Sequence, residues 1–192
     1  ILAQDLEIPR DISSAAFFLV TGAIGKQSEI FLPKIGINPT RIGVIEVLNN
    51  MGAKLDITSR NKVGGEEIAD LRIISSSLKG TRIEGAMIPR LIDEIPVLMV
   101  AAAAAEGKTE VKDAAELRVK ESDRIAAIER ELKKLGANEQ SFQDGLVVQG
   151  PTQFAAGPFQ SAGDHRMAMS MAIAATQASS PSIIEDVACV ET

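Results

Sequence analysis

The stretch that decides the fold is residues 91–107, LIDEIPVLMVAAAAAEG, which is apolar over most of its length and stops at Gly107. Pro96 suits the first turn of a helix. A helix that is hydrophobic on all sides has to be buried. We therefore expect a buried, Ala-rich helix here, with Asp93 at its start and a strand after it at residues 109–112.

Similar openings occur at two other places in the chain. Residues 11–20 read DISSAAFFLV and residues 163–169 read GDHRMAM; each leads into an apolar helix, and strand-like stretches follow at 29–37 and 182–187. The acidic residues at positions 11, 93 and 164 that open these stretches are 82 and 71 residues apart. A repeat of this length is typical of a small α/β unit rather than of a solenoid. We infer three units in one compact domain, at roughly residues 8–85, 86–150 and 151–192.

The first two units continue with an amphipathic helix. One is expected at residues 41–51 and stops at Gly52, before strand-like stretches at 54–58 and 71–74; the other is expected at 121–135 and stops at Gly136. The second carries apolar residues on one face at helical spacing. The third unit lacks this helix, so the sequence predicts an α/β (α+β) fold whose third unit is truncated.

Each buried helix follows an acidic residue, Asp11, Asp93 or Asp164, and Asp is a favoured N-cap. If the units pack around a pseudo-threefold axis with these helices parallel, the positive ends of the helices converge on one face and attract anions. The alternative interpretation is that the three residues act only as caps.

The bulk composition excludes several classes of protein. A net charge of −6 argues against nonspecific nucleic-acid binding, and no apolar run approaches the roughly 20 residues that span a bilayer. The single cysteine, Cys189, excludes an intrachain disulfide and suits the cytoplasm. The chain begins with Ile1 and is expected to be a piece of a longer protein.

The strongest local motif is LRVKESDRI at residues 117–125, at the start of an expected helix. On a helix, Lys120 and Arg124 would face the same way, repel each other and oppose the helix dipole. A bound phosphate or carboxylate would reverse both penalties. The alternative is a solvated, charged helix start that Glu121 and Asp123 balance.

His165 and Arg166 form a second motif, directly after the expected cap Asp164. The Arg166 guanidinium offers a planar fork for phosphate or carboxylate, and His165 is the only histidine of the chain. Together with carboxylates for proton transfer, these cations predict a site for phosphorylated substrates and acid–base chemistry. The candidate site residues are Asp93, Lys120, Glu121, Arg124, His165 and Arg166.

The motifs RVKESDR at 118–124 and GDHRMAM at 163–169 resemble the two signatures of the C-terminal domain of enolpyruvylshikimate-phosphate synthases, which belong to the enolpyruvyl transferases. Residues 11–17 and 92–96 resemble two further segments of this family in the same order. Arg10 departs from the family, which usually has Gly there, and Glu116 stands where some members have Asn.

The resemblance implies a two-domain enzyme in which each domain contains three βαβαββ units. This chain, residues 1–192, would be its single C-terminal domain. The implied reaction transfers the enolpyruvyl group of phosphoenolpyruvate to the 5-hydroxyl of shikimate 3-phosphate and releases phosphate, in the shikimate pathway to aromatic amino acids. Its implied partners are the two substrates and the N-terminal domain. No metal and no organic cofactor are implied, and glyphosate would compete for the donor site.

The resemblance also implies a role for each site residue. Asp93 would accept the hydroxyl proton, Lys120 would contact the shikimate phosphate ligand and the intermediate, and Glu121 would handle the proton on the methylene carbon. The groups that would hold the carboxylate and phosphate of phosphoenolpyruvate, or line that site, are Arg124, Arg166 and His165.

Two other functions remain open at this point. An enolpyruvyl transferase that acts on UDP-N-acetylglucosamine would share the fold and the donor, although residues 120–124 favour shikimate. The chain could also be a non-catalytic binding or folding module, because half of the expected cleft is absent. We hypothesise that the isolated chain folds, binds anions weakly and is inactive without the N-terminal domain.

Overall fold

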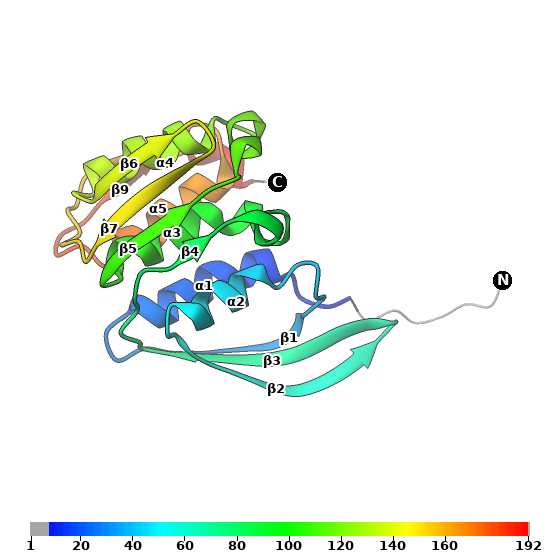
Figure 1. Ribbon diagram of the computed structural model, residues 1–192. Helices are drawn as coiled ribbons and strands as arrows, with labels where there is room; N and C mark the ends of the chain where they lie inside the picture. The colour runs from blue at the N-terminus through cyan, green and yellow to red at the C-terminus, as the bar shows by residue number, and fades with distance from the viewer. Residues whose placement is uncertain (1–7, 192) are drawn as a thin grey trace.

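Three central helices dominate the computed structural model, which describes residues 8–191 and has the predicted α/β fold (Figure 1). They are α1 (Ile12–Ile24), α3 (Ile95–Ala104) and α5 (His165–Ala175), and each packs against the other two. Every side chain of α3 from Ile95 to Ala103 is buried. The prediction from residues 91–107 is confirmed, because a helix without a polar face is stable only in the interior.

Each central helix connects two parallel strands. β4 (Arg82–Ile83) and β5 (Gly107–Val111) flank α3, and β8 (Pro158–Gln160) and β9 (Ile183–Glu185) flank α5. Around α1 the same pairing is reduced to a parallel bridge between Arg10 and Ile35, which lies in β1 (Glu29–Gly36). The repeat that the sequence predicts is therefore present three times.

A second helix and an antiparallel hairpin complete the first two units. In the first, α2 (Gly43–Asn50) leads to β2 (Lys54–Val63) and β3 (Glu66–Ile74), in the sheet order β1-β3-β2. In the second, α4 (Arg124–Lys134) leads to β6 (Asn138–Phe142) and β7 (Gly145–Gly150), in the order β4-β5-β7-β6. β4 belongs to this second sheet, so the second unit begins slightly before the predicted boundary at residue 86. Within residues 8–191 the third sheet contains only β8 and β9.

The second helices of the two complete units end in the same way. Gly52 and Gly136 adopt φ values of 84° and 88°, which only glycine accepts without strain. The amides of Ala53 and Ala137, next in the chain, each donate a hydrogen bond to the carbonyl five residues upstream, at 2.9 and 3.0 Å. This is the closing turn typical of helices that end at glycine, so the stops predicted at Gly52 and Gly136 are confirmed.

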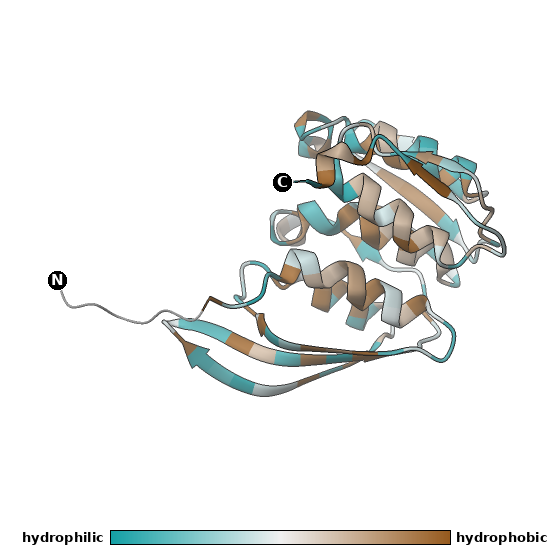
Figure 2. Cartoon of the chain, turned by 180° about the vertical axis from the view of Figure 1, so that it is seen from behind, coloured by the Kyte–Doolittle hydropathy of each residue, from teal (hydrophilic) through white to brown (hydrophobic). Residues whose placement is uncertain are grey.

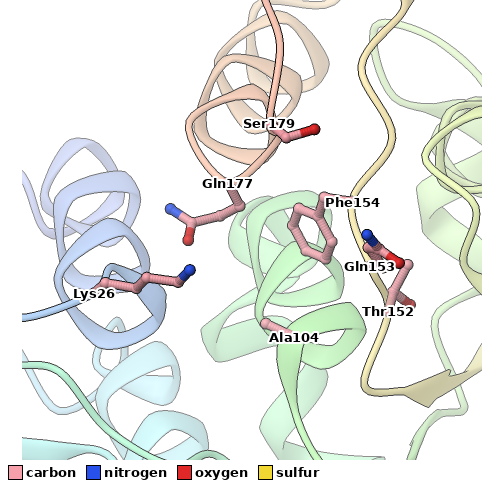
Figure 3. A pocket seen from close by; sticks show the side chains of 7 residues that line it. All are labelled: Lys26, Ala104, Thr152, Gln153, Phe154, Gln177 and Ser179. Carbon is pink, nitrogen blue, oxygen red and sulfur yellow. The ribbon is translucent and has the colours of Figure 1, made fainter.

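The three central helices run parallel. Their N-terminal ends meet at one pole of the structure, which we call the N-terminal pole, where Arg166 at the start of α5 lies 3.9 Å from Glu94 just before α3. Their C-terminal ends meet at the opposite pole, where Lys26, Ala104 and Gln177 line one hollow of about 310 Å³ (Figure 3). The positive ends of the helix dipoles therefore gather on one face, as the repeat predicted, and the hollow in Figure 3 lies at the negative ends.

Apolar residues fill the space between these helices and the two larger sheets, and Figure 2 shows the hydrophobic colour along the central helices. The predicted buried helix at the start of the first unit is α1, most of whose residues are buried, although Phe18 is 54% exposed and Ser14, one turn earlier, is also exposed. One side of α1 thus faces solvent. No helix in residues 8–191 is long and apolar enough to cross a membrane.

Candidate functional site

Two of the three predicted helix caps are present at the N-terminal pole. The carboxylate of Asp11 accepts a hydrogen bond from the amide of Ser14 at 2.7 Å, and that of Asp164 accepts one from the amide of Arg166 at 2.9 Å. The prediction is wrong for Asp93, which lies in a short 3₁₀ helix, Ile92–Glu94, ahead of α3. This extra turn moves Asp93 away from the first amides of α3 and leaves its carboxylate to contact cations.

Arg124 lies at the centre of the site and is 0% exposed. Its guanidinium donates hydrogen bonds from Nε to Asp164 at 2.8 Å, from Nη1 to Asp93 at 2.9 Å and from Nη2 to Glu121 at 2.6 Å. Burial alone lowers the pKa of Arg124, but its hydrogen bond to Asp164 and the neighbouring carboxylates outweigh burial and raise it. Arg124 is thus a charged, completely buried group that carboxylates from three segments surround.

Asp164 is the site residue that the sequence identified only as a cap. Its buried carboxylate accepts hydrogen bonds from Arg124 and from the hydroxyl of Ser122, at 2.8 and 3.1 Å. Burial alone raises the pKa of Asp164, but the hydrogen bond from Arg124 leads the effects that hold it below its usual value. Because 40 residues separate the two partners, no local pattern in the sequence indicates this contact.

Lys120 precedes α4 rather than lying on it, because the helix begins only at Arg124, with Asp123 as its N-cap. The predicted stacking of Lys120 and Arg124 on one helix face is therefore wrong. The two cations still converge, since Lys120 Nζ lies 3.8 Å from the Asp93 oxygen that Arg124 contacts. Lys120 also forms an ion pair with Glu116 at 2.9 Å.

Arg166 approaches Asp93 from the third unit. Its Nη2 lies 3.7 Å from Asp93 and its Nη1 lies 3.9 Å from Glu94, both beyond hydrogen-bond distance. His165 and Arg166 line a hollow of about 280 Å³ between the first turns of α1 and α5. The remaining walls of this hollow are Ser14, Phe17, Met169 and Val190.

Asp93 is the point where the cations of the second and third units meet. Burial alone raises the pKa of Asp93, but Arg166, Arg124 and Lys120 outweigh burial and hold it below its usual value. Asp93 is therefore ionised at neutral pH. The structure brings five of the six predicted residues into one connected cluster and places His165 in the adjoining hollow.

Glu94 is a second group of this pole that the sequence did not single out. It is 3% exposed, and its Oε1 has no hydrogen-bond partner within residues 8–191. Burial raises the pKa of Glu94, while the hydroxyl of Ser13 and the charge of Arg166 oppose the rise. A carboxylate buried in this way weakens the folded state when it is ionised.

Replacing Glu94 by glutamine is therefore expected to raise the free energy of unfolding at pH 7 to 8. A carboxyl whose pKa is higher in the folded state contributes stability only below its unfolded pKa of about 4.3, and this contribution is lost as the pH rises through the folded value. The gain from Glu94→Gln should thus disappear as the pH falls below about 4. Urea unfolding of both proteins at pH 4 and pH 8 measures this difference, and an equal difference at both pH values would contradict it.

Comparison with known proteins assigns the family. Residues 2–192 match the family EPSP synthase (3-phosphoshikimate 1-carboxyvinyltransferase). The 3-phosphoshikimate 1-carboxyvinyltransferase of Desulforudis audaxviator is 52% identical over 188 residues, which are 98% of this chain and 44% of that protein. That of Thermosynechococcus vestitus is 53% identical over 183 residues, or 95% of this chain and 42% of that protein. The chain thus spans less than half the length of these relatives.

Solved structures agree with this assignment. An EPSP synthase from Acinetobacter baumannii superimposes with a TM-score of 0.93 at 44% identity, over 96% of this chain and 43% of that one. The enolpyruvyl transferase NikO from Streptomyces tendae has a TM-score of 0.70 at 18% identity, over 95% of this chain and 40% of that one, and shares the fold. Since the family match covers nearly the whole sequence and the relatives are about half identical to it, the chain belongs to the EPSP synthase (3-phosphoshikimate 1-carboxyvinyltransferase) family.

Proposed function

We propose that residues 1–192 form the C-terminal domain of a two-domain, cytoplasmic enzyme that transfers the enolpyruvyl group of phosphoenolpyruvate to the 5-hydroxyl of shikimate 3-phosphate. The observation that carries this proposal is the convergence of Lys120, Arg124 and Arg166 on Asp93 at the positive ends of three helices. Such a cluster suits two anionic substrates and a reaction that moves protons. The proposal includes no metal and no organic cofactor.

In this proposal the anions are bound mainly by Arg166 and Lys120. Each of them contacts fewer carboxylates of the protein than Arg124 does. Arg166, which forms no hydrogen bond to Asp93 or Glu94, binds phosphoenolpyruvate, and His165 lines the same hollow. Lys120 contacts shikimate 3-phosphate. Arg124 reaches the donor only if an oxygen of the donor displaces Asp93 or Glu121 from its guanidinium.

The proton transfers fall to Asp93 and Glu121. Glu121 protonates the methylene carbon of phosphoenolpyruvate while the acceptor hydroxyl attacks the adjacent carbon and Asp93 takes the hydroxyl proton. The C–O bond that joins this carbon to the phosphate then breaks, phosphate leaves with the proton that Asp93 returns, and Glu121 removes a methyl proton to restore the double bond. Bound anions would also offset the charges of Lys120 and Arg166, which raises the pKa of Asp93 and makes it a better base.

The first test is an assay of phosphate release from the two substrates. We expect none from this chain alone, because the other half of the cleft is missing, and release when a separately produced N-terminal domain of a relative is added. Release should require both substrates. If the folded chain releases no phosphate in the mixture, the proposed activity is contradicted. Turnover by the chain alone would contradict the need for the second domain.

A further inference from the structure

The two arginines of the site, Arg124 and Arg166, differ in how many of their N–H donors form hydrogen bonds to the protein. Arg124 donates hydrogen bonds of 2.6 to 2.9 Å to carboxylates from three segments. Arg166 has carboxyl oxygens on two sides, at 3.7 and 3.9 Å, and hydrogen bonds to neither. Its N–H groups are therefore held near the site by charge and are open to an incoming anion.

Glu94 is the less expected of the two carboxyls beside Arg166. It is buried, one of its oxygens lacks a hydrogen-bond partner in the described part of the chain, and the ion pair that it makes is with Arg166. An apolar residue would fill this place at a lower cost to stability. Packing therefore gives no reason for a carboxyl here, whereas the position of Arg166 does.

The far side of Glu94 is anchored to the first unit. Ser13, in the first turn of α1, is buried, and its hydroxyl lowers the pKa of the Glu94 carboxyl. The same hydroxyl accepts a hydrogen bond from Nη2 of Arg41 at 2.8 Å, and this nitrogen lies 3.7 Å from Asp11. Glu94 thus lies between a buried hydroxyl of the first unit and the guanidinium of Arg166 in the third.

We propose that Glu94 is a positioning residue that holds the Arg166 guanidinium in place for the anionic donor. Glu94 attracts Nη1 of Arg166, and Asp93 attracts Nη2. The guanidinium is oriented while its N–H donors remain available, which reduces the entropy that the donor must overcome on binding. The inference rests on the proposed function, and it explains part of the affinity of the enzyme for phosphoenolpyruvate.

The test is a double-mutant cycle of Glu94→Gln and Arg166→Gln in this chain, alone and reconstituted with the N-terminal domain. In the chain alone, NMR of the arginine Nε–Hε groups should show Arg166 losing its restraint in Glu94→Gln. In the reconstituted enzyme, the KM for phosphoenolpyruvate should rise about tenfold, with the KM for shikimate 3-phosphate unchanged. In the Arg166→Gln background, Glu94→Gln should have no further effect, because it acts through Arg166.

Glu139→Gln is the matched control. Glu139 on β6 also has a buried oxygen without a hydrogen-bond partner among the described residues, and burial likewise raises the pKa of its carboxyl, but it does not contact the site. It should leave both the Arg166 signal and the KM for phosphoenolpyruvate unchanged. If Glu94→Gln behaves like this control, or weakens donor binding equally with and without Arg166, the positioning role is overturned. Failure of the proposed function would appear separately, because the unsubstituted chain mixed with the N-terminal domain would then release no phosphate. The NMR signal of Arg166 in the chain alone would still decide whether Glu94 positions it.

Discussion

Replacing Arg124 by methionine is expected to lower the free energy of unfolding by about 3 to 5 kcal/mol, the usual effect of removing one partner of a buried ion pair. Methionine nearly fills the volume but leaves Asp164, which is also completely buried, without its main partner. Asp93 and Glu121 lose a hydrogen bond as well. A loss of this size is a large part of the total stability of a single domain.

Urea unfolding followed by circular dichroism measures this effect, and Arg72→Met is its control. Arg72 also contacts two carboxylates, Glu29 at 2.7 Å and Asp56 at 3.2 Å, but its side chain is 43% exposed. Exposed pairs contribute about 1 kcal/mol or less, so this variant should unfold nearly as the unmodified chain does. Equal losses in the two variants would show that the buried network is not what stabilises the N-terminal pole.

Replacing Glu121 by glutamine should lower kcat of the reconstituted enzyme by roughly 10²- to 10⁴-fold, the range for loss of a general acid or base. The amide keeps the shape of the side chain and an oxygen for the 2.6 Å contact with Arg124, but it neither delivers nor accepts the proton of the methylene carbon. The KM for phosphoenolpyruvate should change little, because the cations that bind it remain.

Phosphate release at saturating substrates checks this expectation, with Glu67→Gln as the control. Glu67 is an exposed carboxylate of β3 in the first sheet and contacts none of the site residues, so its variant should keep full activity. A Glu121→Gln enzyme that turned over at the normal rate would remove Glu121 from the proton transfers. A rise in KM without a fall in kcat would instead assign it to binding.

Features set by neighbouring residues in the chain were predictable from the sequence. The all-apolar run of α3 requires burial wherever the helix packs. The stops at Gly52 and Gly136 depend on a backbone angle that glycine adopts most readily, so both helix ends could be located before any tertiary structure was known. The repeat itself follows from such local signals, since each unit opens with an apolar helix that a strand follows.

Contacts between units were decided only by the tertiary structure. The pairing of Arg124 with Asp164 joins the second unit to the third, and the approach of Arg166 to Asp93 and Glu94 does the same. No periodicity relates residues so far apart in the chain, and the packing of the helices determines which charges are buried together. The sequence alone therefore determined the family, the repeat and five residues of the charged cluster. The hydrogen bonds of Arg124 to three carboxylates and the burial of Glu94 required the folded structure, because hydrogen bonding and burial depend on distant neighbours.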